Sequence, residues 1–248
     1  MSRGGPSGGF KRLFIRAVPR RLVMPLRFGY RRLLGRLDRE LQLLPVLVGA
    51  RATALDIGAN VGLYTYALAR WFTRVEAFEP LPESAAVIEA YGAPNVRVHR
   101  VALSARRGTG VLHVPLEGGR TNSQRASFAS GVEGKAVEVP LETVDHFEFE
   151  NVSFMKIDVE GHELEVLKGA VQTLAAHRPV LLVEIERRHL DFPMENVFAF
   201  LDGIGYRGYF VSPTGLRSIR EFSPAQYQED ALLDVTSRDY INDFFFLR

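Results

Sequence analysis

Short apolar runs alternate with helical patterns along most of the chain after Pro45, and this alternation restricts the fold more than any other feature. It is typical of β/α units, in which parallel strands are joined by helices that cross the sheet. The apolar runs contain few polar residues, as in the sequence VLLV at 180–183, which favours strands buried on both faces. We therefore predict an α/β fold with a mostly parallel central sheet.

The individual elements follow from the same patterns. Strands are expected at 52–57, 75–78, 96–101, 154–157, 180–185, 206–211 and 243–247, and helices at 62–71, 82–91 and 162–177. The alternation is interrupted at about 110–149, where two strand-like pieces flank a polar stretch rich in Gly and Ser. We predict a hairpin-like insertion with a mobile tip in this segment.

The charge of the chain is unevenly distributed. Residues 1–40 contain 11 Lys or Arg and 2 Asp or Glu, whereas residues 41–248 contain 20 and 27. A basic partner surface, if the chain has one, is therefore expected at the N-terminus. The acidic remainder would repel phosphates, so we expect no nucleic-acid partner.

The basic segment also has its own helical pattern. Residues 1–9 are rich in Gly and Ser and are expected to be disordered, and Pro19 and Pro25 prevent one long helix. Apolar residues then recur at intervals of three and four, which predicts one amphipathic helix that ends before Pro45. These residues are Leu26, Tyr30, Leu33, Leu37, Leu41 and Leu44. We expect a basic extension at 1–45 and a main domain at 46–248.

Two interpretations of the extension remain open. Its helix packs on the main domain, or on a second copy in a homodimer, and leaves a basic face in solvent. Alternatively, residues 10–44 contact an anionic surface such as a membrane leaflet or a lipid-linked substrate. The sequence has no apolar run long enough to span a bilayer and no cysteine. We therefore expect a cytoplasmic protein, with or without peripheral membrane contact.

The strongest motif is LDIGANVG at residues 55–62, a strand that runs into a glycine turn and then a helix. Gly58 can adopt a positive φ and lets backbone approach a ligand, and Gly62 permits close helix packing. The dinucleotide pattern G-x-G-x-x-G is absent. A carboxylate before the first glycine, Asp56, and the amide of Asn60 suit a ligand with a cationic amino-acid end.

Acidic residues follow two further strands. Glu79 ends the strand after the glycine turn, where a carboxylate accepts hydrogen bonds from ribose hydroxyls. Asp158 and Glu160 follow the strand at 154–157, in the sequence MKIDVEGHE, and are expected near a reacting centre. Alternatively, Glu160 only stabilises the next helix through its dipole. A metal set of Asp158, Glu160 and His162 lacks a diagnostic spacing, so we predict no metal site.

These motifs carry a family resemblance. The segments LDIGANVGLYTYALAR, AFEPLPES, NVRVHRVALS, ETVDHF, FMKIDVEGHELEVLKGA and RPVLLVEIE, in this order, resemble the FkbM family of S-adenosylmethionine-dependent methyltransferases over residues 54–209. The resemblance implies a class I methyltransferase fold, a Rossmann-like three-layer sandwich with a seven-stranded sheet whose last strand is antiparallel. It also implies S-adenosylmethionine as the cofactor and O-methylation of a hydroxyl on a sugar, glycolipid or natural-product scaffold.

The resemblance also implies roles for single residues. Those expected around the methionine end of the cofactor are Asp56, Gly58, Ala59, Asn60 and Gly62. Glu79 would hold the ribose, Ala102 and Leu103 would lie beside the adenine, and Asp158 would lie near the methyl group.

An alcohol acceptor needs a base, because a neutral hydroxyl is a weak nucleophile. We expect Asp158, Glu160 or His162 to accept the proton, with the last two favoured because Asp158 faces the cofactor's ammonium group. Glu186 is a reserve candidate for substrate binding. We assign no site to the other histidines, including His189, and expect Tyr64 in the core.

Other functions remain open on the same residues. A non-catalytic module could bind the cofactor alone, and the acceptor could be a nitrogen or a nucleic acid.

Overall fold

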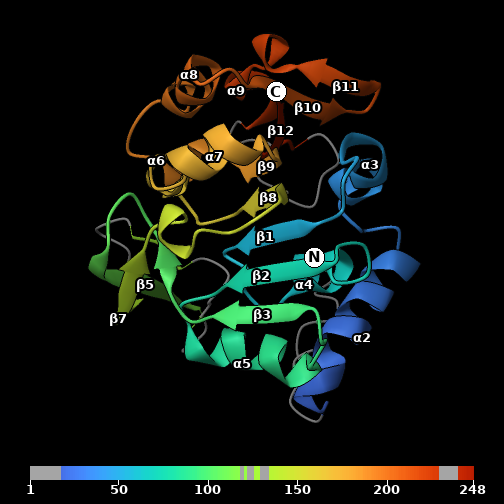
Figure 1. Ribbon diagram of the computed structural model, residues 1–248, viewed down its shortest axis with the longest axis vertical. Helices are drawn as coiled ribbons and strands as arrows, with labels where there is room; N and C mark the ends of the chain where they lie inside the picture. Colours follow the sequence, from blue (N-terminus) through green and yellow to red (C-terminus); the bar gives the residue numbers. More distant parts are fainter. Residues whose placement is uncertain (1–17, 118–119, 122–125, 129–133, 229–239) are drawn as a thin grey trace, which may run out of the picture.

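The computed structural model describes residues 18–117, 120–121, 126–128, 134–228 and 240–248. Within these residues the central sheet has eight strands in the order β11-β10-β12-β9-β8-β1-β2-β3 (Figure 1). Five neighbouring strands run parallel: β3 (Val96–His99), β2 (Arg74–Phe78), β1 (Thr53–Ile57), β8 (Val152–Ile157) and β9 (Val180–Glu184). Their carboxyl ends meet at one edge of the sheet.

The last strand, β12 (Asp243–Leu247), lies antiparallel between β9 and β10 (Arg207–Ser212). This arrangement confirms the predicted class I methyltransferase sheet of seven strands with an antiparallel last strand. One strand was not predicted, because β11 (Gly215–Ser218) is short and polar; it pairs with β10 through a tight hairpin.

Apolar residues on both faces of the sheet hold the layers together. Leu55 and Ile57 of β1 pack in one core with residues of α6 (Glu163–Lys168), α7 (Val171–His177) and α8 (Glu195–Gly203). Ala54, which precedes Leu55, packs in a second core with α3 (Arg39–Leu47) and α4 (Leu63–Leu68). The side chains of successive strand residues point to opposite faces, so two-sided burial explains the continuous apolar runs.

The remaining elements complete the three layers. Helix α5 (Pro82–Tyr91) has the predicted bounds, whereas α8 was not predicted. Short elements are η2 (Asp145–Phe147), η3 (Arg187–His189), η4 (Ile219–Glu221) and α9 (Pro224–Tyr227). None of the helices in the described part of the chain has the length and apolar content needed to cross a bilayer.

The helix predicted at 162–177 is two helices, α6 and α7, so that prediction is wrong. The break falls at Gly169, where the carbonyl oxygen of Ser104 approaches the chain so closely that a Cβ would lie 2.1 Å from it. The second half of the pattern therefore starts a new helix after Ala170.

The single helix predicted at 26–44 is also wrong, because the structure has α2 (Arg20–Leu33) and α3 in its place. Gly35 ends α2 with a φ of 61°, and the N–H groups of Gly35 and Arg36 donate to the carbonyls of Arg32 and Arg31. This is the Schellman pattern, which satisfies the last carbonyls of a helix. Pro25 and Pro45 lie inside the two helices and do not bound them.

The buried face of α2 differs from the predicted one. Val23 and Met24 are buried, whereas Leu26, Tyr30 and Leu33 of the predicted apolar stripe are exposed. The helix packs on α4 and α5, and Met24 reaches a core cluster with Ala59 and Ile88.

The segment at 110–149 contains a long antiparallel pair, β5 (Gly108–Glu117) with β7 (Gly134–Glu142). Two short strands join it: β4 (Ala102–Leu103) pairs with β7 in parallel, and β6 (Arg120–Thr121) pairs with β5. The arrowheads of β1, β2 and β3 point toward this pair in Figure 1. Most of the predicted tip, at 118–119, 122–125 and 129–133, lies outside the described residues.

Candidate functional site

A cavity of about 430 Å³ opens at the carboxyl ends of the parallel strands. The turn after β1, Glu79 after β2, Asp158 after β8 and Glu184 at the end of β9 line it. Ala102 and Leu103 of β4 add an apolar wall. All predicted cofactor residues line the cavity except Gly62, whose backbone lies at the start of α4.

Close packing between strands fixes the glycine turn. Gly58 has a φ of 78°, and a Cβ added there would lie 1.8 Å from the carbonyl oxygen of Asp158. The N–H groups of Gly58 and Ala59 both donate to the carbonyl of Phe78 at 3.0 Å. A side chain at residue 58 would therefore force β1 and β8 apart.

The carboxylate of Glu79 joins the turn to β2. One oxygen accepts the N–H of Asn60 and the other that of Leu81, each at 2.8 Å. The side chain is buried, and this burial raises the pKa of Glu79 to about 7 despite the two backbone hydrogen bonds. Each carboxylate oxygen can accept a further hydrogen bond, so ligand hydroxyls can still bind there.

Two buried polar atoms at the cavity have no hydrogen-bond partner among the described residues. They are Oδ1 of Asn60 and the hydroxyl of Tyr64. Buried polar atoms are seldom left unpaired, so these two indicate where a polar ligand would bind. Tyr64 packs against the second core, as predicted, and its ring also lies beside Lys156 at the cavity.

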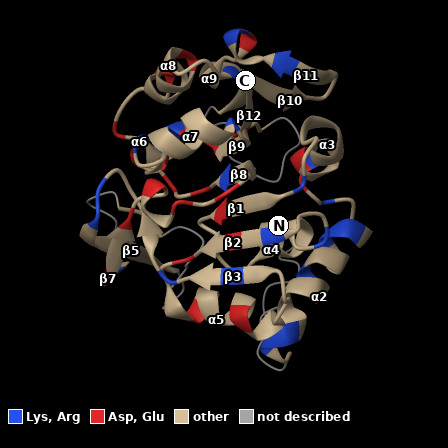
Figure 2. Ribbon diagram, viewed as in Figure 1, with Lys and Arg blue, Asp and Glu red and all other residues tan. Residues whose placement is uncertain are grey.

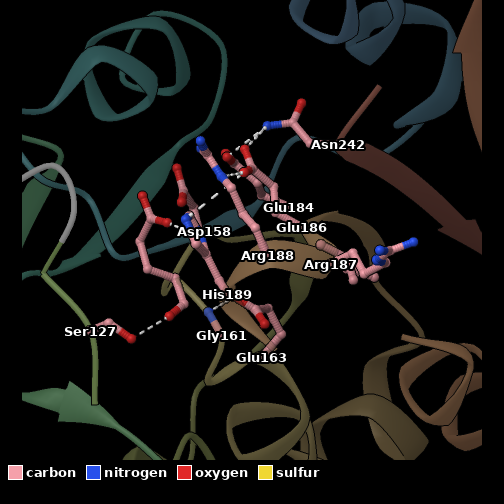
Figure 3. A network of polar contacts seen from close by, with 12 residues as sticks. Ser127, Asp158, Gly161, Glu163, Glu184, Glu186, Arg187, Arg188, His189 and Asn242 are labelled. Carbon is pink, nitrogen blue, oxygen red and sulfur yellow. Dashed lines mark hydrogen bonds and ion pairs between the residues drawn. The ribbon is translucent and has the colours of Figure 1, made fainter. Parts of the chain in front are cut away.

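Carboxylates outnumber cations around Lys156. Its Nζ lies 3.2 Å from Asp243, 3.6 Å from Glu184 and 3.7 Å from Asp158. Burial would lower the pKa of Lys156, but these three charges raise it well above its ordinary value. Figure 3 shows Asp158 and Glu184 at this edge of the sheet. Burial raises the pKa of Asp243, and burial together with nearby carboxylates raises that of Glu184 well above its ordinary value, so a further cation would be favourable here.

The candidate bases do not all face the cavity. Asp158 and Glu160 line it, but His162 is not among its described lining residues. The Nε2 of His162 lies 2.9 Å from Oγ of Ser104, and burial lowers its pKa. Glu160 has a φ of 51° and Gly161 one of 98°, so the chain turns before His162 and directs it toward β4.

His189 is a site residue that the sequence analysis missed. Its Nδ1 forms an ion pair with Glu160, and its Nε2 lies 3.9 Å from Glu186 (Figure 3). Burial would lower the pKa of His189, but the hydrogen bond to Glu160 and the two carboxylates raise it. Burial raises the pKa of Glu160 itself. The only signal in the sequence is that His189 closely follows a strand end.

Glu186, the reserve candidate, lines the cavity and forms an ion pair with Arg188. It also accepts hydrogen bonds from Tyr240 at 3.1 Å and from Asn242 at 2.8 Å. Asn242 and Asp243 reach this edge because β12 is antiparallel. Among the described residues, no group of three or more His, Asp or Glu side chains is arranged to hold a metal ion.

Comparisons with known proteins agree with this architecture. A family model described as the methyltransferase FkbM domain matches residues 56–208. A solved methyltransferase FkbM from Methylobacillus flagellatus KT has a TM-score of 0.51 and 18% identity, and the match covers 86% of this chain and 49% of that chain. At this identity the likeness shows a shared fold, and the present chain spans about half the length of that protein.

A second solved structure, a methyltransferase from Streptococcus mutans in complex with SAH, has a TM-score of 0.47 and 10% identity. That match covers 86% of this chain and 99% of the other. No curated protein sequence matches the chain.

The burial of Glu79 predicts how stability changes with pH. Its folded-state pKa of about 7 exceeds the ordinary value of 4.5, so the folded state binds the proton more tightly than the unfolded state. The resulting stabilisation is complete at low pH and is lost as the pH rises through about 7. Glu79→Gln removes this titration. Between about pH 5 and pH 8, the free energy of unfolding of the wild type should therefore fall by about 1–3 kcal/mol more than that of the variant.

Urea denaturation at several pH values measures this difference. Glu83→Gln is the matched control, because Glu83 lies on the exposed side of α5 and should leave the slope unchanged. An identical pH slope in Glu79→Gln and the wild type would contradict the assignment.

Proposed function

We propose that this chain, which belongs to the FkbM family of methyltransferases, methylates a hydroxyl oxygen of a sugar, glycolipid or natural-product scaffold. The cofactor of this family is S-adenosylmethionine. The observation that carries the proposal is the cavity itself, in which a glycine turn and an excess of carboxylates meet at the edge of a parallel sheet. Ligands of open α/β sheets bind at this edge.

The residues of the cavity fit this cofactor. The unpaired Oδ1 of Asn60 and the remaining lone pairs of Glu79 can accept hydrogen bonds from ribose hydroxyls or an ammonium group. Ala102 and Leu103 offer apolar surface to an adenine ring. When bound, the cofactor supplies an electrophilic methyl group on a positively charged sulfur.

The charge of the cavity supports the same ligand. Asp158, Glu184 and Asp243 exceed the single positive charge of Lys156, and they are largely shielded from solvent. In such surroundings a cation is attracted more strongly than in water. Asp56 is buried behind the turn and accepts a hydrogen bond from Thr65 at 2.5 Å. Burial raises the pKa of Asp56 to about 6, and its carboxylate adds to the negative field when it is ionised.

Glu160 is the group that we assign as the general base. It lines the cavity, and its carboxylate is held by His189, so that its position is fixed before a substrate binds. A raised pKa brings a carboxylate closer to the value at which it accepts a proton efficiently. Asp158, paired with Lys156, orients and attracts the cationic ligand, and His189 is a positioning residue.

Cofactor binding can be tested without knowing the acceptor. At about 100 times its dissociation constant, S-adenosylhomocysteine (SAH) should stabilise the protein by about 2.7 kcal/mol, or about 5–10 °C in melting temperature. Glu79→Ala should reduce the shift, because the ribose hydroxyls lose their acceptor. NAD is the negative control in the same thermal-shift assay, and a folded wild type that SAH does not stabilise would refute the proposal.

Catalysis can be tested by transfer of a labelled methyl group to a panel of sugars, glycolipids and polyhydroxylated scaffolds. Glu160→Gln should lower kcat by about 10²–10⁴-fold, the usual contribution of a general base, with SAH affinity almost unchanged. Glu165→Gln on the exposed side of α6 is the matched control.

The linkage of the product distinguishes the proposal from its rivals. A methyl ether supports it, whereas methylation of nitrogen alone would refute the hydroxyl assignment. Full activity in Glu160→Gln would remove Glu160 as the base.

A further inference from the structure

Helix α2 brings two arginines to the wall of the cavity, Arg27 and Arg31. Arg31 donates to Asp38 at 3.3 Å. Arg27 is only partly exposed and has no hydrogen bond or ion pair with any described residue. Burial and the nearby charge of Arg31 lower its pKa. A half-buried guanidinium without a counter-ion is costly, because it has lost water and gained no partner.

The other cations of the cavity have carboxylate partners. Lys156 lies among three carboxylates, and Arg188 is paired with Glu186. Among the described lining residues, Arg27 is therefore the cation that lacks a nearby acidic group. The cavity is thus divided into an acidic region at the strand ends and a basic region on α2.

The position of Arg27 relates this basic region to the glycine turn. Met24 lies three residues earlier on α2, and residues three apart share one face of a helix. The Cε of Met24 would lie 2.7 Å from a Cβ at Gly62, so the side chain packs directly on the turn. Arg27 therefore lies about one turn of α2 beyond Met24, the residue that packs on Gly62.

We infer that Arg27 binds the α-carboxylate at the methionine end of the cofactor. This inference rests on the proposed function. The cofactor has an ammonium and a sulfonium, which suit the acidic region, and one carboxylate, which that region would repel. A guanidinium forms two parallel hydrogen bonds with a carboxylate, and such charged pairs are strong when shielded from water.

Calorimetric titration with SAH and methylthioadenosine tests the inference, because the second ligand keeps the nucleoside and thioether but lacks the amino-acid group. Arg27→Gln should weaken SAH binding about tenfold or more and leave methylthioadenosine binding unchanged. Arg32→Gln, an exposed arginine on the same helix, should leave both unchanged.

Other outcomes separate the two proposals. If Arg27→Gln binds SAH as tightly as the wild type, or loses both ligands equally, the inference is wrong. If the wild type fails to bind SAH, the proposed function fails instead.

A different observation concerns the outer face of α2. Large apolar side chains are exposed along it: Leu22 at 42%, Leu26 at 52%, Tyr30 at 48%, Leu33 at 84% and, just after the helix, Leu34 at 44%. We call these five residues the outer stripe. The helix itself carries five arginines and no acidic residue, and Figure 2 shows this basic character along α2.

We propose that the outer stripe docks on a bilayer surface that contains anionic lipid. An exposed apolar stripe beside arginines is the pattern of a helix that lies in a membrane interface. The positive charge of α2 complements lipid phosphates, whereas the acidic strand edge would be repelled by them. Because Arg27 and Arg31 of α2 line the cavity, docking would place the ligand site near the membrane.

Vesicle flotation tests this proposal. The protein should bind vesicles of phosphatidylcholine with phosphatidylglycerol, should bind pure phosphatidylcholine much less, and should be released by salt. Leu26→Glu combined with Leu33→Glu should reduce binding about tenfold or more. Val46→Glu, which places a single glutamate on another highly exposed apolar residue, is the control for added negative charge.

Absence of wild-type binding at low salt would overturn the proposal. So would self-association of the wild type that the double variant abolishes, because the outer stripe would then be an interface between copies.

Discussion

The contact between β1 and β8 at their carboxyl ends is the constraint on which the rest of the site depends. The backbone at Gly58 approaches the carbonyl of Asp158 so closely that no side chain fits between them. This contact sets the turn after β1 and brings Asp158 beside it. Glu79 completes the arrangement, because its two oxygens hold the N–H groups of Asn60 and Leu81. These contacts join the carboxyl ends of β8, β1 and β2, and the cavity forms where those ends meet.

Electrostatic imbalance is the second property of this cavity. Carboxylates gather around Lys156 at the strand ends, while Arg27 on α2 has no described partner. Each group costs free energy in the protein alone: burial and neighbouring carboxylates raise the pKa of Glu184, and burial and Arg31 lower that of Arg27. A ligand with both positive and negative groups relieves both. Binding sites often retain such unfavourable features because the ligand compensates for them.

Much of the site could be predicted from local patterns, but the directions of some side chains could not. Asp158, Glu160 and His162 are close in the sequence, which suggested one cluster. The left-handed conformations of Glu160 and Gly161 separate them, so that Glu160 meets His189 and His162 meets Ser104. A positive φ is uncommon at a glutamate such as Glu160, and the residue type does not predict it.

The sequence by itself determined the strands of the parallel sheet, the glycine turn and the carboxylates at the strand ends, because apolar periodicity and glycine act over a few residues. Only the tertiary structure decided which face of α2 is buried. Both faces carry apolar residues, Val23 and Met24 on one and Leu26 and Leu33 on the other, so the pattern alone does not choose between them. The tertiary structure also decided that Asp243 forms an ion pair with Lys156, because β12 inserts antiparallel beside β9. Burial and charge pairing depend on what packs against a residue, and distant segments supply those neighbours.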